Sequence, residues 1–441
     1  MKVAVIGTGY VGLVTGVSFA EYGNDVTCVD IDVEKIKKMR QGIPPIHEDG
    51  LPEMMKRNID HGRLCFTTDL KEGVLDAAVI FLALPTPESE DGSADLKYIL
   101  DVADQLGSLL KSYTVVVNKS TVPIGTADKV RERLGQNAKV AFDVVSNPEF
   151  LREGQAVKDV KKPDRIVIGS LSKKAVEIMS ELYEPYVKNG HPIRFMSERS
   201  AELTKYGANG FLATKVSYFN ELATLAELVG ADIDDVRLAM GDDPRIGLAF
   251  THVSLGWGGS CFPKDTRALI HIANGHGQDL KITKAADEAN DEQKKSLPKK
   301  VIKYYKGSIK DKKIALWGLA FKKDTDDIRE SPAVDVLLAL LAAGAKVVAY
   351  DPQAIGNVKK LYGDNKSLSF VDSQYEALKD ADTLVIATDW EEFTTTDFNK
   401  VKSLLRAPVI FDGRNLYKPA AMKRRGFYYE SIGRAVVDPH A

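Results

Sequence analysis

The chain has 441 residues, 44% of them hydrophobic, which is enough for two or three cores because single cores stop growing near about 250 residues. Its 60 lysines and arginines nearly balance 62 aspartates and glutamates, which argues against binding to nucleic acid or an anionic membrane. No stretch approaches the roughly 18 apolar residues of a membrane span. Three scattered cysteines form neither a disulfide framework nor a zinc site. With no signal-peptide pattern, we expect a cytoplasmic protein without a metal.

Short β-branched runs alternate with helical patterns through the first half of the chain. The expected strands are "KVAVIG", "DVTCVDID", "AAVIFLALP", "TVVVNKS", "KVAFDVVSNP" and "RIVIGS". Such alternation predicts a parallel sheet with helices on both faces. Residues 1–196 are therefore expected to form a Rossmann-like domain.

A long helix is predicted next. Residues 197–230 combine good helix formers with a serine cap and a closing glycine, and they indicate one helix of about 45 Å. Shorter helical patterns follow, so residues 197–300 are expected to form a central helical domain. The charged segment 291–313 is typical of an exposed approach to another domain, which we expect at residues 312–441.

The last domain repeats the first in outline. "KKIALWGLAF" parallels "MKVAVIGTGY", and "AKVVAYDP", "DTLVIATDW" and "PVIFDGRN" parallel later strands of the first domain in the same order. The predicted fold is α/β, with two Rossmann-like doubly wound domains joined by a long central helix and a small helical domain. In the last domain, Leu319 is expected at the position that Gly9 occupies in the first domain, and Lys322 at the position of Gly12. The second domain is therefore expected to bind another ligand.

A glycine motif follows the first expected strand. In "GTGYVG", Gly7 permits a tight turn, Gly9 lets the backbone approach a pyrophosphate at a helix N-terminus, and Gly12 allows close helix packing. Asp30 ends the second strand, where a carboxylate binds ribose hydroxyls and repels a 2′-phosphate, which favours NAD over NADP. A glycine-rich turn without a ligand is the alternative.

Two more loops follow later strands, on the edge where ligands of open α/β sheets bind. They are "LPTP" (84–87) and "KSTVP" (119–123). Thr86 and Thr121 are candidates for bonds to the cofactor, and a plain turn role is the alternative for each.

One cysteine has unusual neighbours. Free cysteines are usually small buried hydrophobes, and we expect this of Cys28 and Cys65. In "GWGGSCFPKD", glycines are expected to leave the backbone open to a ligand. Lys264 adds positive charge that favours the thiolate over its ordinary pKa of about 8.5. Cys261 is therefore a predicted nucleophile.

Two further pairs of polar residues are candidates for the same site. Lys205 and Asn209 are four residues apart on the predicted helix, so they share one face and could point into one cleft. Glu149 and Glu153 in "SNPEFLREG" follow another first-domain strand. A surface lysine and a solvated helix start are the respective alternatives.

Four motifs in this order, "GTGYVG", "SNPEFLREG", "KYGANGFLATKVSYFNE" and "GGSCFPKD", resemble the nucleotide-sugar 6-dehydrogenase family over about residues 1–420. The resemblance implies an N-terminal NAD domain, a central domain whose long helix is the core of a homodimer, and a C-terminal domain that binds the UDP part of the substrate. The implied reaction is the four-electron oxidation of UDP-glucose to UDP-glucuronate through a thiohemiacetal and a thioester on Cys261.

The resemblance also implies individual roles. Lys205, Asn209 and Asp265 surround the sugar C6 and order a catalytic water, while Glu149 and Thr121 assist in hydrolysis. The expected cofactor contacts are Gly7, Gly9, Tyr10, Val11, Gly12, Asp30, Lys35, Thr86, Thr121, Glu153, Lys264 and Arg329. The expected substrate contacts are Glu149, Phe150, Leu151, Lys205, Asn209, Arg245, Phe250, Gly258, Phe321, Lys322 and Arg414, with Arg245 acting across the dimer interface.

Several alternatives remain open. GDP-mannose or UDP-N-acetylmannosamine is the alternative substrate, although the GDP-mannose enzymes typically carry a histidine at the position of Leu212. Trp257 departs from the tyrosine or phenylalanine usual in the family, and "SLG" (254–256) is less typical there. Outside the family, the alternatives are a two-electron hydroxyacid dehydrogenase and a non-catalytic NAD-binding scaffold.

Overall fold

The structure is a computed structural model that describes residues 1–89, 91–188 and 190–439. Residues 90 and 189 of the predicted first domain and residues 440–441 of the predicted last domain lie outside the described residues. Contacts divide the chain into two compact units, residues 1–208 with 267–278 and residues 209–266 with 279–441. The limits 1–196, 197–300 and 312–441 stay a prediction.

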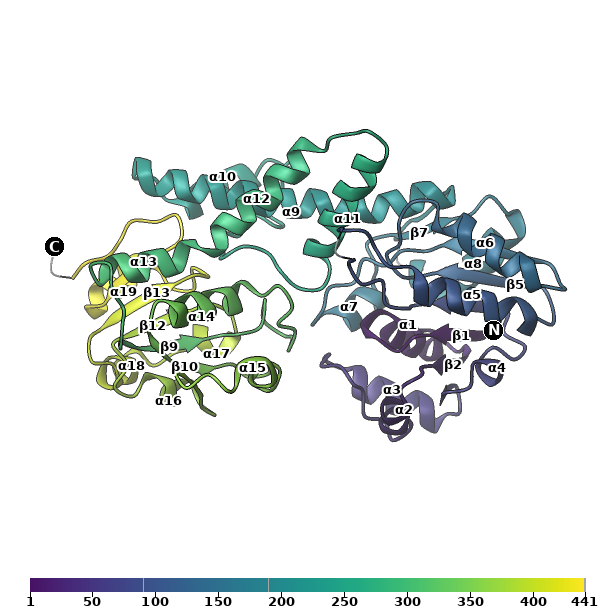
Figure 1. Cartoon of the computed structure of the whole chain (residues 1–441), viewed down its shortest axis with the longest axis horizontal. Helices are drawn as coiled ribbons and strands as arrows, with labels where there is room; N and C mark the ends of the chain where they lie inside the picture. The colour runs from purple at the N-terminus through teal and green to yellow at the C-terminus, as the bar shows by residue number, and fades with distance from the viewer. Residues whose placement is uncertain (90, 189, 440–441) are drawn as a thin grey trace. The chain divides into compact units, whose positions relative to one another are not determined.

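The first unit is built on an eight-stranded sheet (Figure 1). Its strands are β1 (Lys2–Ile6), β2 (Asp25–Val29), β3 (Leu64–Thr67), β4 (Val79–Leu82), β5 (Thr114–Asn118), β6 (Phe142–Ser146), β7 (Ile166–Gly169) and β8 (Ile193–Met196). Their order is β3-β2-β1-β4-β5-β6-β7-β8. Pairing is parallel except between β6 and β7, so the prediction of a parallel sheet is wrong at this one pair.

Helices surround this sheet and bury both of its faces. They are α1 (Tyr10–Glu21), α2 (Val33–Arg40), α3 (Leu51–Asp60), α4 (Leu70–Gly73), α5 (Lys97–Leu109), α6 (Thr126–Asn137), α7 (Ala156–Lys161) and α8 (Lys173–Val187). Two hydrophobic clusters form, and all residues of β4 and β5 are buried, which is why β4 and the three valines of β5 show no alternation of apolar and polar residues.

The two cysteines of this sheet differ in exposure. Cys28 on β2 is buried, as predicted. Cys65 is exposed, so the prediction that it is buried is wrong. The reason is that β3 is an edge strand with alternating sides, where Leu64 and Phe66 point into the core and Cys65 points out.

The long helix is present as α9 (Glu198–Val229), with 32 residues and a length of about 48 Å. It begins in the first unit and ends in the second. The next helices are α10 (Ile233–Gly241), α11 (Phe262–Gly275), α12 (Lys281–Lys294) and α13 (Ser296–Tyr304). Within the described ranges, no helix has the length and apolarity needed to span a membrane.

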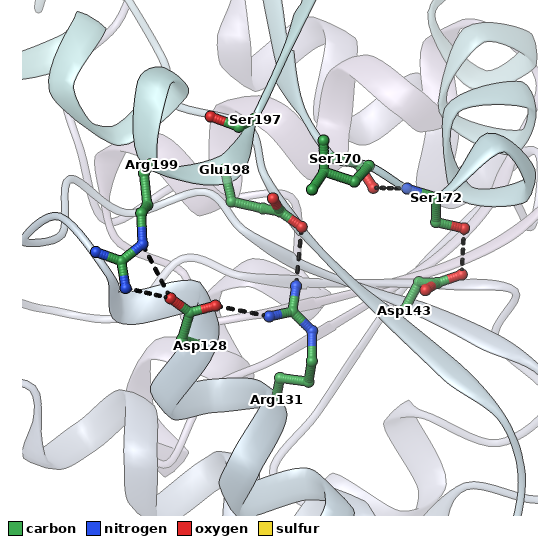
Figure 2. A pocket seen from close by; sticks show the side chains of 9 residues that line it. Asp128, Arg131, Asp143, Ser170, Ser172, Ser197, Glu198 and Arg199 are labelled. Carbon is green, nitrogen blue, oxygen red and sulfur yellow. Dashed lines mark hydrogen bonds and ion pairs between the residues drawn. The ribbon is translucent and has the colours of Figure 1, made fainter.

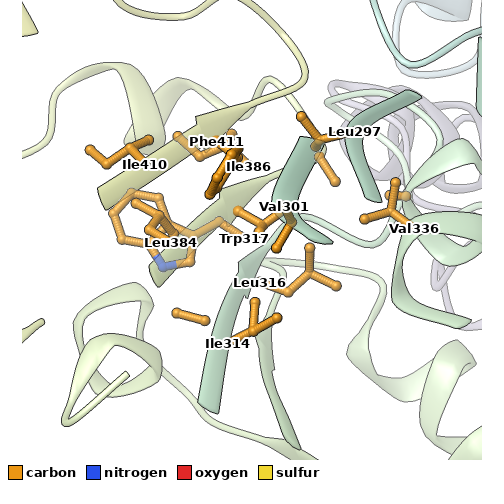
Figure 3. Close-up of a cluster of buried hydrophobic side chains, with 14 of the residues drawn as sticks. Leu297, Val301, Ile314, Leu316, Trp317, Val336, Leu384, Ile386, Ile410 and Phe411 are labelled. Carbon is orange, nitrogen blue, oxygen red and sulfur yellow. The ribbon is translucent and has the colours of Figure 1, made fainter. Parts of the chain in front are cut away.

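The second unit holds a six-stranded, fully parallel sheet in the order β11-β10-β9-β12-β13-β14. Its strands are β9 (Lys313–Trp317), β10 (Lys346–Tyr350), β11 (Leu368–Phe370), β12 (Thr383–Ile386), β13 (Val409–Asp412) and β14 (Tyr428–Ser431). Its helices are α14 (Pro332–Ala342), α15 (Ile355–Tyr362), α16 (Gln374–Leu378), α17 (Glu391–Thr394), α18 (Phe398–Leu404) and α19 (Pro419–Arg425). Figure 3 shows part of the core around Trp317, whose ring stacks on Phe393. The predicted pair of Rossmann-like folds is confirmed.

The two folds align at a shared turn. Gly7 and Gly318 both have a φ of 97°. The N–H of Gly7 donates to the carbonyl oxygen of Val29 at the end of β2, and the N–H of Gly318 donates to that of Tyr350 at the end of β10, both at 2.8 Å. Counting from these glycines, Ala320 stands at the position of Gly9. The prediction of Leu319 there, and of Lys322 at the position of Gly12, is wrong by one residue.

The second fold uses its strand-end carboxylate differently from the first. Asp351 stands where Asp30 does, but it is buried, and its Oδ2 accepts the N–H of Leu319 at 2.7 Å and of Ala320 at 3.1 Å. The indole of Trp390 donates to the same oxygen at 3.0 Å. The Asp351 carboxylate is therefore already hydrogen-bonded within the protein.

Candidate active site

The glycine loop between β1 and α1 has the geometry of a phosphate cradle. A Cβ on Gly7 would lie 2.4 Å from the carbonyl oxygen of Ala83, and one on Gly12 would lie 2.0 Å from the carbonyl oxygen of Gly7. Both positions therefore require glycine. A Cβ on Gly9 would meet nothing within 4 Å, so the backbone there faces open space at the start of a helix. The loop fits the pyrophosphate of a dinucleotide.

Asp30 lies next to this loop at the end of β2. Its Oδ2 accepts the N–H of Thr8 at 3.0 Å and the Thr8 hydroxyl at 2.5 Å. Burial raises the pKa of Asp30, but the bonds from Thr8 and Asp32 and the charge of Lys35 outweigh it, so the pKa is lowered. The carboxylate is thus ionised at neutral pH and can accept ribose hydroxyls.

Glu48 is a residue that the sequence did not single out. It accepts a hydrogen bond from the hydroxyl of Tyr10, which lies with Val11 in the first turn of α1. Its carboxylate also accepts the N–H of Gly154 at 2.8 Å. Gly154 follows Glu153, so Glu48 fastens the cofactor motif to the loop that carries this predicted residue. No periodicity or motif marks Glu48 in the sequence.

The loops after β4 and β5 are joined by the two predicted threonines. The hydroxyl of Thr86 donates to the backbone oxygen of Thr121 at 3.0 Å. Thr86 is buried and Thr121 is partly exposed. The bond holds the two loops together, and their roles toward a cofactor stay a prediction.

Glu149 and Lys205 form a buried ion pair in the first unit, with Lys205 Nζ 3.0 Å from Glu149 Oε1. The side chain of Lys205 is 4% exposed, so the alternative of a surface lysine is excluded. Glu149 Oε2 accepts the N–H of Leu151 at 2.5 Å. Burial raises the pKa of Glu149, but Lys205, the Leu151 N–H and Lys119 outweigh it, and the pKa is lowered.

The aromatic ring beside this pair belongs to Phe150. The ammonium of Lys205 lies 5.4 Å from the ring centroid, and the guanidinium of Arg165 lies 3.7 Å from it. An aromatic face attracts both cations. Phe150 and Leu151, both predicted substrate contacts, therefore serve here to hold the Glu149 and Lys205 side chains.

The second unit gathers the predicted residues around Cys261. Asp265 lies in the first turn of α11, is 1% exposed, and donates its N–H to the carbonyl oxygen of Cys261 at 2.8 Å. Asn209 Nδ2 donates to Asp265 Oδ2 at 2.6 Å, and Lys264 Nζ lies 2.6 Å from Asp265 Oδ1. The Cys261 sulfur lies 3.4 Å from the hydroxyl oxygen of Ser260. A carboxylate fixed on both sides therefore lies one helical turn from a thiol.

The glycines before Cys261 make close contacts with other parts of the second unit. A Cβ on Gly258 would lie 2.0 Å from the backbone oxygen of Glu330, and one on Gly259 would lie 2.8 Å from the ring of Phe321. A Cβ on Gly256 would lie 2.6 Å from an oxygen of Asn290. They therefore admit neighbouring protein segments, and the expectation that they leave backbone open to a ligand stays a prediction. A substrate contact at Gly258 stays a prediction.

Trp257, which departs from the family pattern, is fully accommodated. Its indole N–H donates to Ser217 at 3.0 Å, and its backbone exchanges two hydrogen bonds with the Asn290 side chain at 2.7 and 3.0 Å. Its ring meets Phe262 edge-on at 6.2 Å. A buried indole N–H needs a hydrogen-bond partner, which Ser217 supplies. These contacts fix the loop that precedes Cys261.

The remaining predicted substrate and cofactor contacts lie in loops of the second unit. Arg414 binds Asp389 at 2.5 Å, and this arginine outweighs burial to lower the pKa of Asp389. Arg245 and Arg329 form ion pairs with Asp243 and Asp327 of their own loops at 2.6 and 2.7 Å. Phe250, Phe321, Lys322 and Arg414 are partly exposed.

A separate cavity of about 400 Å³ in the first unit contains none of the predicted site residues. Figure 2 shows an ion-pair chain along its wall, in which Asp128 binds Arg199 and Arg131, and Arg131 also binds Glu198. The distances are 2.7 to 2.8 Å. These pairs link α6 to the start of α9, so we assign the wall a structural role.

Comparisons with known proteins agree along most of the chain. Residues 1–187 match the NAD binding domain of the UDP-glucose/GDP-mannose dehydrogenase family, residues 199–292 its central domain, and residues 315–419 its UDP binding domain. A UDP-glucose 6-dehydrogenase of Pseudomonas aeruginosa is 48% identical, with 98% of each chain covered.

Solved structures give the same result. A UDP-glucose dehydrogenase from Pyrobaculum islandicum has a TM-score of 0.90 at 37% identity, with 98% of each chain covered. A UDP-D-ManNAc dehydrogenase from Pyrococcus horikoshii has a TM-score of 0.85 at 29% identity, covering 98% of this chain and 99% of that one.

Proposed function

Since the chain belongs to the UDP-glucose/GDP-mannose dehydrogenase family, whose NAD binding domain it carries, we propose that it oxidises UDP-glucose to UDP-glucuronate. The observation that carries the proposal is the arrangement around Cys261, where a buried carboxylate is fixed by Asn209 and Lys264 within one helical turn of a thiol. A two-electron alcohol dehydrogenase needs no such thiol.

The overall reaction converts a primary alcohol, one water and two NAD into a carboxylate, two NADH and three protons. NAD supplies the hydride acceptor in both oxidations. The glycine loop would hold its pyrophosphate, and Asp30 would accept bonds from its ribose. The other steps depend on the side chains of the chain itself.

Cys261 acts as the nucleophile. After the first oxidation its thiolate adds to the aldehyde carbon, and the new C–S bond makes that carbon tetrahedral, so that it still carries a hydrogen that can leave as hydride. Loss of this hydride and of the hydroxyl proton gives a thioester. Asp265 then orients a water, whose oxygen attacks the acyl carbon while its two protons pass to the solvent. The C–S bond breaks, which releases the carboxylate and restores the thiolate.

Lys205 and Asn209 stabilise the oxyanion of each tetrahedral species, because an ammonium and an amide N–H are the donors that such a charge requires. Their spacing of four residues on α9 supports a shared direction. Glu149, paired with Lys205, assists in moving protons during hydrolysis. Thr121 takes part in the same water network.

The proposed function predicts two NADH for each UDP-glucose consumed, with NAD preferred over NADP. Absorbance at the NADH band and the amount of UDP-glucuronate measure this, with UDP-galactose, UDP-N-acetylmannosamine and GDP-mannose as parallel substrates. One NADH per substrate would indicate a two-electron dehydrogenase, and none would indicate a scaffold. A preference for GDP-mannose would contradict the proposed substrate but not the proposed class of reaction.

We also propose that the chain forms a homodimer through α9. Phe211, Tyr218 and Leu225 are 68%, 50% and 52% exposed and follow one another at intervals of seven residues, which places them on one face of the helix. A stripe of large apolar side chains favours burial against an identical helix.

Replacing Phe211 and Leu225 together by glutamate is expected to convert the dimer into a monomer, because like charges would face each other across the stripe. Light scattering after size-exclusion chromatography measures the mass. The control is Leu361→Glu on α15, which is 66% exposed and lies outside the stripe, and it should remain dimeric. A double variant with unchanged mass would contradict the proposal.

We place the protein in the cytoplasm. Cys28, Cys65 and Cys261 are thiols that take part in no disulfide among the described residues, and a reactive thiol persists best in a reducing compartment.

A further inference from the structure

Glu202 is a buried carboxylate that the proposed mechanism does not use. It lies on α9, within the first unit, and is 3% exposed. Glutamate is almost never buried unless its charge is bound, because transfer of a carboxylate out of water is costly. Its burial therefore needs an explanation from the groups that bind it.

Three donors from two other segments of the first unit bind the Glu202 carboxylate. Oε2 accepts the N–H of Gly125 at 2.6 Å, and Oε1 accepts the N–H of Ala127 at 3.0 Å. Oε1 also accepts the hydroxyl of Ser146, the last residue of β6, at 3.0 Å. Burial raises the pKa of Glu202, and these donors offset part of the rise because they favour the ionised form.

The start of α6 depends on this carboxylate for its cap. The N-cap residue of α6 is Gly125, which has a φ of 93° and no side chain that could accept the first N–H groups of the helix. Such N–H groups need acceptors, and a negative charge near them also interacts favourably with the helix dipole. Glu202 supplies the acceptor from a position 77 residues further along the chain.

The bond to Ser146 lies beside the ion pair of Glu149 and Lys205 in the sequence of both segments. Ser146 and Glu149 are three residues apart, and so are Glu202 and Lys205 on α9. Side chains three residues apart are neighbours on one face of a helix. Two successive contacts, Ser146 with Glu202 and Glu149 with Lys205, therefore cross-link the same two segments.

The helix also packs closely on the sheet at this point. A Cβ on Gly169, at the end of β7, would lie 2.6 Å from the Cβ of Ala201, so α9 lies directly against the strand. Packing alone restricts the distance of a helix from a sheet more than its rotation about its own axis. The bonds of Glu202 restrict the rotation, which decides where Lys205 points.

We propose that Glu202 is a positioning residue: by binding the start of α6 and the end of β6, it fixes the turn of α9 that directs the Lys205 ammonium toward Glu149. The inference rests on the proposed function, because it assigns the consequence to the oxyanion that Lys205 stabilises. Glu202 itself touches neither substrate nor cofactor in this account. Its effect on the reaction passes through Lys205.

The first test is Glu202→Gln in the full chain. The amide keeps the shape of the side chain but sets an NH₂ group against the Gly125 N–H or against the Ala127 and Ser146 donors. We expect kcat with UDP-glucose to fall about tenfold, with the KM for NAD changed less than about twofold because Asp30 and the glycine loop take no part in these bonds. NADH absorbance measures both.

A double-mutant cycle separates positioning from a general loss of structure. Lys205→Gln should lower kcat strongly by itself, and its amide can still donate to Glu149. In that background Glu202→Gln should lower kcat less than about twofold further, because a residue that acts through Lys205 has no effect once Lys205 is gone. A structural role would instead repeat the loss of about tenfold.

Glu198→Gln is the matched control. Glu198 lies one helical turn before Glu202, and its carboxylate binds Arg131 at 2.8 Å on the wall of the separate cavity (Figure 2). The variant removes a carboxylate from the same helix and leaves the bonds of Glu202 in place. Its kcat should stay within about twofold of the parent.

Hydrogen exchange gives a readout that does not depend on activity. The N–H groups of Gly125 and Ala127 should exchange at least about tenfold faster in Glu202→Gln than in the parent, because their acceptor is weakened. Mass spectrometry of peptides that cover residues 123–130 measures the rates. Glu198→Gln should exchange at the rate of the parent in these peptides.

Ser146→Ala is the second variant, for use if Glu202→Gln does not fold. It removes one donor and leaves the carboxylate bound to the N–H groups of Gly125 and Ala127. We expect a loss in kcat of about threefold, which should again disappear in the Lys205→Gln background.

Three results would overturn the inference. They are an unchanged kcat in Glu202→Gln, losses that multiply in full when Glu202→Gln and Lys205→Gln are combined, and unchanged exchange at Gly125 and Ala127. All three concern the variants. A parent that forms no NADH from UDP-glucose would overturn the proposed function itself, and the inference with it.

Discussion

Cys261→Ala should form NADH from UDP-glucose at least about a thousandfold more slowly than the parent protein, because no C–S bond can hold the aldehyde as a tetrahedral adduct. UDP-glucuronate should be undetectable on the time scale of the parent reaction. The fold should be retained, since Cys261 is only partly buried and its removal opens no closed cavity. Stopped-flow absorbance and product chromatography measure the two effects.

The matched control is Cys65→Ala. Cys65 is an exposed thiol on β3, so its loss tests the effect of removing a thiol elsewhere in the chain. Its rate should stay within about twofold of the parent. UDP-glucuronate formed by Cys261→Ala at a rate near that of the parent would exclude covalent catalysis by this residue.

Asp265→Asn should trap the acyl-enzyme. The carboxylate is 1% exposed and accepts from Asn209 and Lys264, and an amide of the same shape would set an NH₂ group against one of these two donors. Water orientation is lost together with the negative charge, so kcat is expected to fall about a hundredfold or more. Intact-protein mass spectrometry after quenching should show a mass increase on Cys261.

Asp128→Asn is the control for loss of one carboxylate. Asp128 forms its ion pairs with Arg131 and Arg199 at the wall of the separate cavity, so the variant should turn over without accumulating an adduct. If Asp265→Asn lost activity with no acylated protein, Asp265 would act before the thioester forms, contrary to the proposed mechanism.

The sequence predicts those features that depend on neighbouring residues along the chain. The roles of Gly7 and Gly12 follow from one short motif, because a tight turn and a close helix contact are local demands that only glycine meets. The length of α9 follows in the same way from its composition and end signals.

Features that depend on distant partners were not predictable in this way. The antiparallel pairing of β7, the exposure of Cys65 and the bonds of Glu48 to Tyr10 and Gly154 all depend on which segments meet in three dimensions. The glycines before Cys261 illustrate the limit. Their number suggested room for a ligand, whereas Gly258 in fact admits the backbone of Glu330.

The buried carboxylate of Asp351 has a consequence for how the reaction is timed. Asp351 already accepts hydrogen bonds from Leu319, Ala320 and Trp390, so the carboxylate at this position of the second Rossmann fold is not offered to a dinucleotide ribose. Within the described residues, one glycine loop suits NAD. An enzyme with one NAD site must exchange NADH for NAD between the two oxidations of each turnover. In the proposed mechanism, the sugar would stay covalently bound to Cys261 while NADH leaves and a second NAD binds.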